Sequence, residues 1–247
     1  MMHWVATWVW LAASSDDDSI TPGLLLMVFA VIPALAVKAY YHLRSGKPLQ
    51  PKKKRFLSTI LVQLMLLLIA MGSANRQGLH LWQTKFPTSV ECLMGLLLIS
   101  AVYVRLRRSW SRRPDAHLAH SRLLLPENSA ELKYWVVISL VAGIGEEYIY
   151  RGVTYAAVLS LTGRIFSSAI ICALAFGAAH LALGIRNGIS TFAMGLVFQF
   201  LVLWTGTLYL AMFVHTAYDL LVGMVAVYEL KRRLPQIQHA LPSTQGI

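Results

Sequence analysis

Charged residues are scarce in this sequence of 247 residues. Only 13% of the residues are charged, whereas a soluble domain carries about 25%. Hydrophobic residues make up 57% of the chain and the mean hydropathy is +0.58. They fall in runs of about 20, the length at which a helix crosses a bilayer. This composition excludes a water-soluble or disordered domain and predicts an integral membrane protein.

Cysteine is nearly absent, and acidic residues are few. Cys92 and Cys172 both lie in apolar runs, so they offer no disulfide framework and no thiolate metal cage. We expect both to be small buried hydrophobic residues.

The N-terminus has no Lys or Arg before its Trp-rich segment 2–13. This segment is too short to span and does not resemble a signal peptide, so an interfacial or re-entrant position is expected.

Seven apolar segments predict an all-α fold, a polytopic bundle of transmembrane helices. They are 22–41, 56–74, 87–104, 134–162, 165–184, 188–204 and 206–228. The fourth is longer than a span and should tilt, bend or break, and Pro33 should kink the first. We divide the chain into an accessory membrane region 1–130, a four-span core 131–230 and a cytoplasmic tail 231–247.

The positive charges are distributed unequally between the two sets of loops. Seventeen Lys and Arg residues lie after spans one, three, five and seven, and three lie on the other side. Positively charged loops remain in the cytoplasm, so the N-terminus should be outside and the C-terminus inside. The net charge of +11 then serves topology, and no nucleic-acid partner is expected. The composition favours a multi-pass protein of a prokaryotic cell (plasma) membrane.

Ionisable residues also lie deep within the last four segments. An ionisable group in hydrocarbon costs at least a few kcal/mol, so its default interpretation is functional. Helical spacing pairs Glu147 with Arg151 and places His215 and Asp219 on one face, while Glu146 points about 100° away from Glu147. Depth along antiparallel spans predicts a shared cavity. The six residues are Glu146, Glu147, Arg151, His180, His215 and Asp219.

Three motifs in this region resemble those of a known family. The stretch from Glu146 to Arg151 resembles the EExxxR motif of the CPBP intramembrane endopeptidases, which include CAAX prenyl endopeptidases and the Abi proteins of bacteriocin processing and self-immunity. The stretch from Phe176 to His180 resembles their FxxxH motif, and that from His215 to Asp219 their HxxxN or HxxxD motif. The resemblance covers roughly 131–228 and leaves the first three spans unmatched.

Peptide hydrolysis requires an activated water, a stabilised oxyanion and a proton donor for the leaving amine. No Ser or Cys stands beside a base, which favours a carboxylate–histidine site that activates water directly. The resemblance implies a glutamic intramembrane protease, without metal or cofactor, whose cavity opens towards the cytoplasm. It implies Glu146 as the general base, His180 holding the water, His215 and Asp219 acting on the scissile carbonyl, and Glu147, Arg151 and Phe176 in support.

The substrate implied is a membrane-associated protein or peptide of CAAX, bacteriocin or sorting-tail type. Three alternatives stay open. The same four residues could bind zinc, although HExxH is absent. The other two are a non-catalytic immunity or peptide-binding protein and a proton-coupled transporter. The lack of an inverted repeat disfavours the transporter.

Some of these residues could instead have a structural role. The Glu147–Arg151 pair could be a buried ion pair that only stabilises the fold. Glycines at 143, 145, 177, 184, 188 and 195 are expected where helices pack closely, and Trp82, Trp110, Trp135 and Trp204 at the membrane interfaces.

Overall fold

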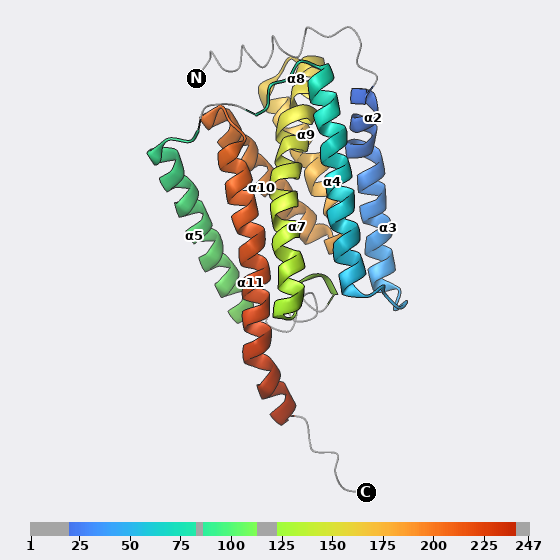
Figure 1. The fold of residues 1–247 in the computed structure, drawn as a ribbon, viewed down its shortest axis with the longest axis vertical. Coiled ribbons are helices and arrows are strands. Elements are labelled where there is room, and N and C mark those ends of the chain that lie inside the picture. The colour runs from blue at the N-terminus through green and yellow to red at the C-terminus, as the bar shows by residue number, and fades with distance from the viewer. Residues whose placement is uncertain (1–19, 83–85, 113–122, 241–247) are drawn as a thin grey trace, which may run out of the picture.

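A computed structural model describes residues 20–82, 86–112 and 123–240 (Figure 1). In these residues every regular element is helical, which confirms the all-α prediction. The elements are α2 Ile20–Leu26, the π-helix η1 Met27–Val31, α3 Ile32–Arg44, α4 Lys52–Arg76, α5 Ser89–Arg112, α7 Ser129–Glu147, the π-helix η2 Tyr148–Val153, α8 Thr154–Thr162, α9 Ile165–Ala179, the 3-10 helix η3 Leu181–Leu183, α10 Ile185–Thr205 and α11 Tyr209–Ala240. The Trp-rich segment 2–13 lies outside the described residues.

Each of the seven predicted spans corresponds to one helical rod in the described chain. Five rods are long and apolar enough to cross a membrane. The rod 129–162 is long enough but is not among these five spans. It contains three charged residues close together, Glu146, Glu147 and Arg151. The prediction of a helix to 184 was wrong, since α9 ends at Ala179 after 15 residues. At 1.5 Å per residue that is about 22 Å, less than the hydrocarbon core.

Two of the rods contain a π-helical turn. The first, η1, comes just before Pro33 at the start of α3, where the proline ring cannot fit an ordinary α-helical turn. The second, η2, begins directly after Glu147 and includes Arg151. The fourth span is therefore broken in register, as predicted, inside its charged motif. This rod ends at Gly163, whose φ of 63° is left-handed and suits a C-terminal glycine.

The rods pack around α7, which lies between α4 and α11, while α9 packs against α10 and α5 against α11. Glycines allow the closest approaches, as predicted for several positions. A Cβ on Gly143 would lie 2.7 Å from the Thr216 amide nitrogen of α11, and one on Gly177 would lie 2.8 Å from the Gly188 carbonyl oxygen of α10. At Gly184 a glycine is favoured for a different reason, because its φ of +97° is a backbone conformation that other residues rarely adopt.

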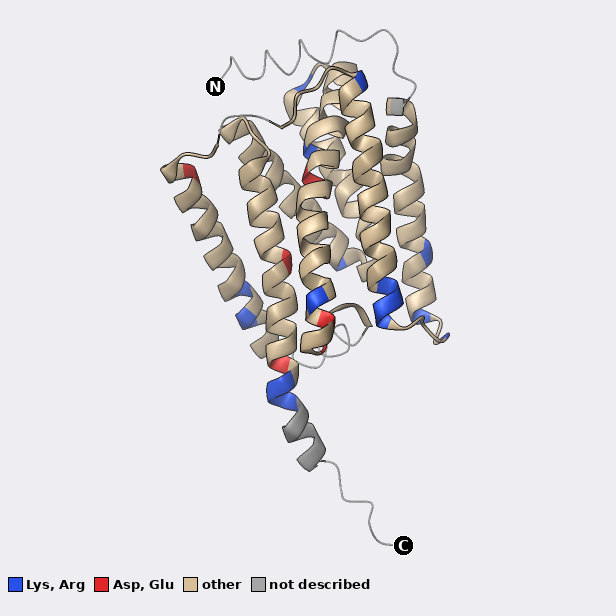
Figure 2. Cartoon of the chain, in the orientation of Figure 1, with Lys and Arg blue, Asp and Glu red and all other residues tan. Residues whose placement is uncertain are grey.

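Lys and Arg gather at one end of the bundle, at the lower end in Figure 2. Ion pairs at this end join separate elements. Glu229 of α11 pairs with Arg107 of α5, and Lys52 of α4 lies 2.8 Å from Glu127, just before α7. The basic end agrees with the loops predicted to be cytoplasmic, and the orientation in the membrane remains a prediction. Lys85, Arg113 and Arg122 lie outside the described residues.

Two smaller expectations fail in the described chain. Cys172 is buried as expected, but Cys92 is exposed on α5, which contacts the rest of the bundle chiefly through α11. Trp110 is only 1% exposed and packs against Val225 and Ala226, so it is a core residue and does not anchor the helix at an interface. Trp82, by contrast, is 47% exposed.

We predict that Gly143→Ala destabilises the bundle. The added methyl group would collide with the α11 backbone at Thr216, and overpacking of this kind costs about 1–3 kcal/mol. Gly145→Ala is the matched control on the same helix, because its Cβ would meet nothing closer than 3.8 Å. Thermal unfolding of the detergent-purified proteins should show a lower Tm for Gly143→Ala than for Gly145→Ala. Equal Tm values would contradict the close packing of α7 on α11.

We further predict a cytoplasmic C-terminus. A green fluorescent protein fused to the C-terminus should fluoresce, and alkaline phosphatase at the same position should be inactive, because that enzyme needs an oxidising compartment for its disulfides. Fusions after Gly78, in the turn that follows α4, should give the opposite result. An active phosphatase at the C-terminus would reverse the orientation inferred from the positive-inside rule.

Candidate active site

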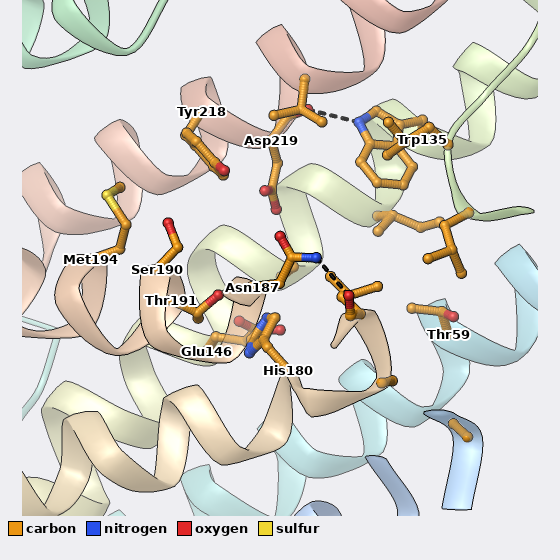
Figure 3. A pocket seen from close by; sticks show the side chains of 18 of the residues that line it. Thr59, Trp135, Glu146, His180, Asn187, Ser190, Thr191, Met194, Tyr218 and Asp219 are labelled. Atoms are coloured by element: carbon orange, nitrogen blue, oxygen red, sulfur yellow. Dashed lines mark hydrogen bonds between the residues drawn. The ribbon is translucent and has the colours of Figure 1, made fainter. Parts of the chain in front are cut away.

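A cavity of about 950 Å³ is lined by residues of α3, α4, α7, α9, α10 and α11 (Figure 3). All four predicted catalytic residues, Glu146, His180, His215 and Asp219, are part of its wall. The wall also includes Arg55 in the first turn of α4, beside Lys52, Lys53 and Lys54, and Arg186 at the start of α10. The predicted convergence is therefore seen, and the cavity connects the buried acidic and histidine groups with the basic end.

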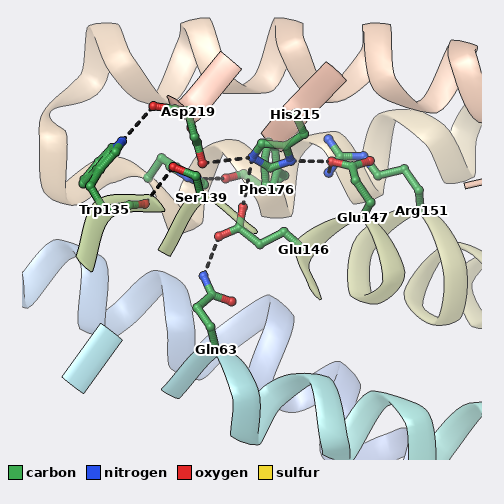
Figure 4. Close-up of polar contacts among 10 residues, drawn as sticks. Gln63, Trp135, Ser139, Glu146, Glu147, Arg151, Phe176, His215 and Asp219 are labelled. Carbon is green, nitrogen blue, oxygen red and sulfur yellow. Dashed lines mark hydrogen bonds and ion pairs between the residues drawn. The ribbon is translucent and has the colours of Figure 1, made fainter. Parts of the chain in front are cut away.

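The most buried part of the site is an ion-pair network centred on Glu147 (Figure 4). The Oε1 atom of Glu147 accepts hydrogen bonds from Arg151 Nη1 at 3.0 Å and from His215 Nδ1 at 2.7 Å. Glu147 is 0% exposed, Arg151 2% and His215 5%. A charge at such depth is tolerated only when it is paired and hydrogen-bonded. The predicted Glu147–Arg151 pair is present, and it also holds the histidine of the third motif.

Glu146 points to another side of α7 and has different partners, as its helical spacing predicts. Gln63 Nε2 of α4 donates to Glu146 Oε1 at 2.6 Å. Glu146 Oε2 has no hydrogen-bond partner among the described residues and lies 3.9 Å from His215 Nε2. A separation above 3.5 Å is too long for a direct hydrogen bond.

Asp219 lies one turn along α11 from His215, and its Oδ2 is 3.7 Å from His215 Nε2. The α11 backbone at this point is tied to α7, because Trp135 Nε1 donates to the Asp219 carbonyl oxygen at 2.7 Å. Gly223 makes room for the indole ring, since a Cβ there would collide with the Trp135 ring. Trp135 thus fixes the α11 backbone beside the site and is not simply an interface anchor.

His180 stands at the C-terminal cap of α9 and not within a continuous helix. Its Nδ1 lies 2.8 Å from the Phe176 carbonyl oxygen. A carbonyl oxygen can only accept, so Nδ1 carries a proton. The ring is part of the cavity wall. The early end of α9 gives His180 this position, because the chain leaves the helix directly after the ring.

Phe176 packs among the charged and histidine side chains. The Arg151 guanidinium lies 4.1 Å from the Phe176 ring centroid, a cation–π distance. The same ring is edge-on to His180, with centroids 4.8 Å apart. On the other side Phe198 stacks on His215, with centroids 5.1 Å apart and an interplanar angle of 22°. The aromatic residues therefore pack against both imidazoles and against the guanidinium of the buried ion pair.

The electrostatic pattern suits a histidine that carries positive charge. Three carboxylates surround His215, with Glu147 at Nδ1 and with Glu146 and Asp219 on the Nε2 side. An imidazolium can donate from both nitrogens and would serve both sides at once. Within the described residues, no group of three or more His, Cys, Asp or Glu side chains has the geometry to hold a metal ion. Metal independence remains a prediction.

Gln63, Trp135 and Phe198 belong to the site but to none of the three motifs. For Gln63 the sequence holds a usable signal, because it is a single amide in the apolar stretch Ile60–Ile69, and a buried polar group in a span calls for a partner. Trp135 and Phe198 are indistinguishable by sequence from ordinary span residues. The interaction of Trp135 with α11 depends on helix packing that periodicity does not reveal.

Comparison with protein families supports the resemblance drawn from the motifs. Residues 128–221 match the family model of the type II CAAX prenyl endopeptidase Rce1-like proteins. The motif-based recognition is thereby confirmed. The matched segment includes all four predicted catalytic residues and leaves α2 to α5 outside. Comparisons with curated proteins and with solved structures gave no match.

The Rce1-like match indicates a peptidase that acts on a membrane-associated peptide. Together with the five long apolar helices it identifies a multi-pass membrane protein. The plasma membrane as the specific location, and the boundaries of the accessory region, core and tail, remain predictions.

For the segment that matches the family model we predict that Arg151→Met is severely destabilising. Removing one partner of a buried ion pair leaves an uncompensated charge and costs about 3 kcal/mol or more. Arg164→Met, at an exposed arginine just before α9, is the control and should change stability little. Thermal unfolding in detergent would separate the two. If both variants unfold at the same temperature, Glu147 is neutral in the folded protein and the ion pair does not exist.

Proposed function

We propose that this protein is a glutamic intramembrane endopeptidase that hydrolyses a peptide bond of a membrane-associated protein or peptide with a directly activated water. The observation that carries the proposal is the meeting of Glu146, His180, His215 and Asp219 on one cavity. These residues come from α7, the C-terminal cap of α9, and α11. A purely structural role would not require them to share the wall of a space large enough for a peptide segment.

In the proposed reaction Glu146 is the general base. A water held between the Glu146 carboxylate and His180 Nε2 attacks the scissile carbonyl carbon and gives a proton to Glu146. The unpartnered Oε2 of Glu146 is suited to accept this proton. General-base catalysis by a positioned side chain contributes about 10²–10⁴-fold.

His215 stabilises the tetrahedral intermediate in this proposal. As an imidazolium held by Glu147, it presents Nε2 to the developing oxyanion, and the Asp219 carboxylate 3.7 Å from Nε2 favours the positive charge of the ring. When the intermediate collapses, the C–N bond breaks and the protonated Glu146 returns its proton to the leaving amine. A preorganised donor at the oxyanion is commonly the largest single contribution to acyl transfer.

The surroundings of the cavity support a substrate that reaches the site from the membrane surface. Its inner end lies among transmembrane helices and its other end among Arg55, Arg186 and His42, at the end predicted to be cytoplasmic. A segment at the cytoplasmic membrane surface can therefore reach Glu146. A CAAX-type substrate agrees best with the Rce1-like match, and bacteriocin-type and sorting-tail substrates fit the same geometry.

The decisive test compares the neo-termini in membranes that carry the wild-type chain or Glu146→Gln at equal expression. Glutamine keeps the shape of the side chain and removes the base, so specific cleavages should fall by at least about 10²-fold. Glu91→Gln is the matched control, because Glu91 caps the far end of α5 through the Thr88 amide and glutamine can serve the same capping box.

The outcomes distinguish the proposal from its alternatives. Cleavages present in the wild type and in Glu91→Gln, but lost in Glu146→Gln, support the protease. Identical profiles with a substrate present would exclude Glu146 as the base and favour a peptide-binding protein or a transporter. Loss of wild-type cleavage on addition of a chelator, restored by zinc, would point to the metal-dependent version of the same site.

A further inference from the structure

We propose that Gln63 is a positioning residue for Glu146, supplied by a helix outside the family-matched segment. The inference rests on the proposed role of Glu146 as the base. It concerns α4, which belongs to the accessory region and lies before the matched residues 128–221. The four-span core would then be incomplete as a catalytic unit without this helix.

Gln63 differs from its neighbours along α4. Val62 is 51% exposed and Leu64 40% exposed, so these side chains point away from the bundle. Gln63 is partly buried and lines the cavity. A side-chain amide in an apolar helix is costly unless it has a partner. The partner in the structure is Glu146 Oε1, 2.6 Å from Gln63 Nε2 (Figure 4).

The helix packing at this level brings Gln63 within reach. Gly145 has no side chain on the face next to α4, and a Cβ there would lie 4.0 Å from the Gln63 carbonyl oxygen and 3.8 Å from Leu67 Cβ. The two helices are therefore in ordinary van der Waals contact beside the base. At this contact the Gln63 amide reaches the Glu146 carboxylate with one hydrogen bond.

This hydrogen bond distinguishes the two oxygens of Glu146. Oε1 is bound by Gln63, whereas Oε2 has no partner in the described chain and is directed to His215. Because Arg151 is bound to Glu147, Gln63 supplies the direct hydrogen bond that orients the base. Gln63 should therefore fix the rotamer of Glu146 and leave Oε2 to take the proton from water.

The test uses full-length protein in liposomes and the peptide whose cut site appears in the neo-terminus comparison. Gln63→Met keeps the length of the side chain and removes the N–H donor. We expect kcat to fall about tenfold, as for a lost hydrogen bond to a charged group, with KM unchanged. Gln63→His retains an N–H donor and should recover most of the rate.

Gln77→Met is the matched control on the same helix. Gln77 is buried and bonds Thr21 and Ser73 at the other end of α4, so this variant loses structural hydrogen bonds far from Glu146. It should unfold at a lower temperature while keeping kcat per folded molecule. If Gln77→Met lowers kcat as much as Gln63→Met does, the effect is one of stability and the positioning role is wrong.

An infrared measurement tests the contact without using activity. The carboxylate band of Glu146, obtained as the difference between wild type and Glu146→Gln, should shift in Gln63→Met and stay in place in Gln77→Met. An unshifted band overturns the inference. A shifted band with unchanged kcat shows a contact with no role in catalysis and overturns it too. If wild-type cleavage does not depend on Glu146, the proposed function itself fails, whatever the band does.

Discussion

The Glu147 carboxylate is the interaction on which the rest of the site depends. One oxygen atom holds both the Arg151 guanidinium and the His215 imidazole, and it does so where Glu147 has no exposed surface. The desolvation cost of these charges is offset only if the geometry is maintained. The network therefore fixes α11 against the rod formed by α7 and η2. The positions of the other side chains in the site depend on this contact.

The π turn after Glu147 is compatible with this demand. A π turn within an α-helix shifts the register of the residues that follow and is common at functional sites. Here it begins directly after Glu147 and includes Arg151. The two carboxylates precede it at the end of α7, about 100° apart around the helix, so they serve two sides of the same rod. Glu147 is committed to the ion pair through Oε1. Each carboxylate keeps its Oε2 without a hydrogen-bond partner in the described chain, and of the two residues Glu146 is the one that lines the cavity. The division of labour between adjacent residues is a consequence of helical geometry.

Much of this arrangement could be predicted from the sequence because charge in an apolar run is costly. That rule singled out Glu146, Glu147, Arg151, His180, His215 and Asp219. Spacing of four correctly paired Glu147 with Arg151. It could not reveal the early end of α9, because Leu181, Ala182 and Leu183 are as apolar as any span residue. It also said nothing of Trp135, whose bond to the Asp219 carbonyl oxygen depends on the crossing of two helices and on the space left at Gly223.

The early end of α9 connects the fold with the chemistry. In a continuous helix the ring of His180 would lie along the surface of α9. Here the chain turns away from the helix axis at His180. It continues through η3 and Gly184 into α10. Irregular backbone at membrane depth is tolerated where it lines a water-filled cavity. The cavity wall includes Ala182, Leu183 and Asn187 of this stretch, so the same break that places His180 also opens the space that water and a peptide need. The proposed hydrolytic site must admit water without exposing its ion pair. The separation of a fully buried Glu147 from a cavity-lining Glu146 meets both requirements.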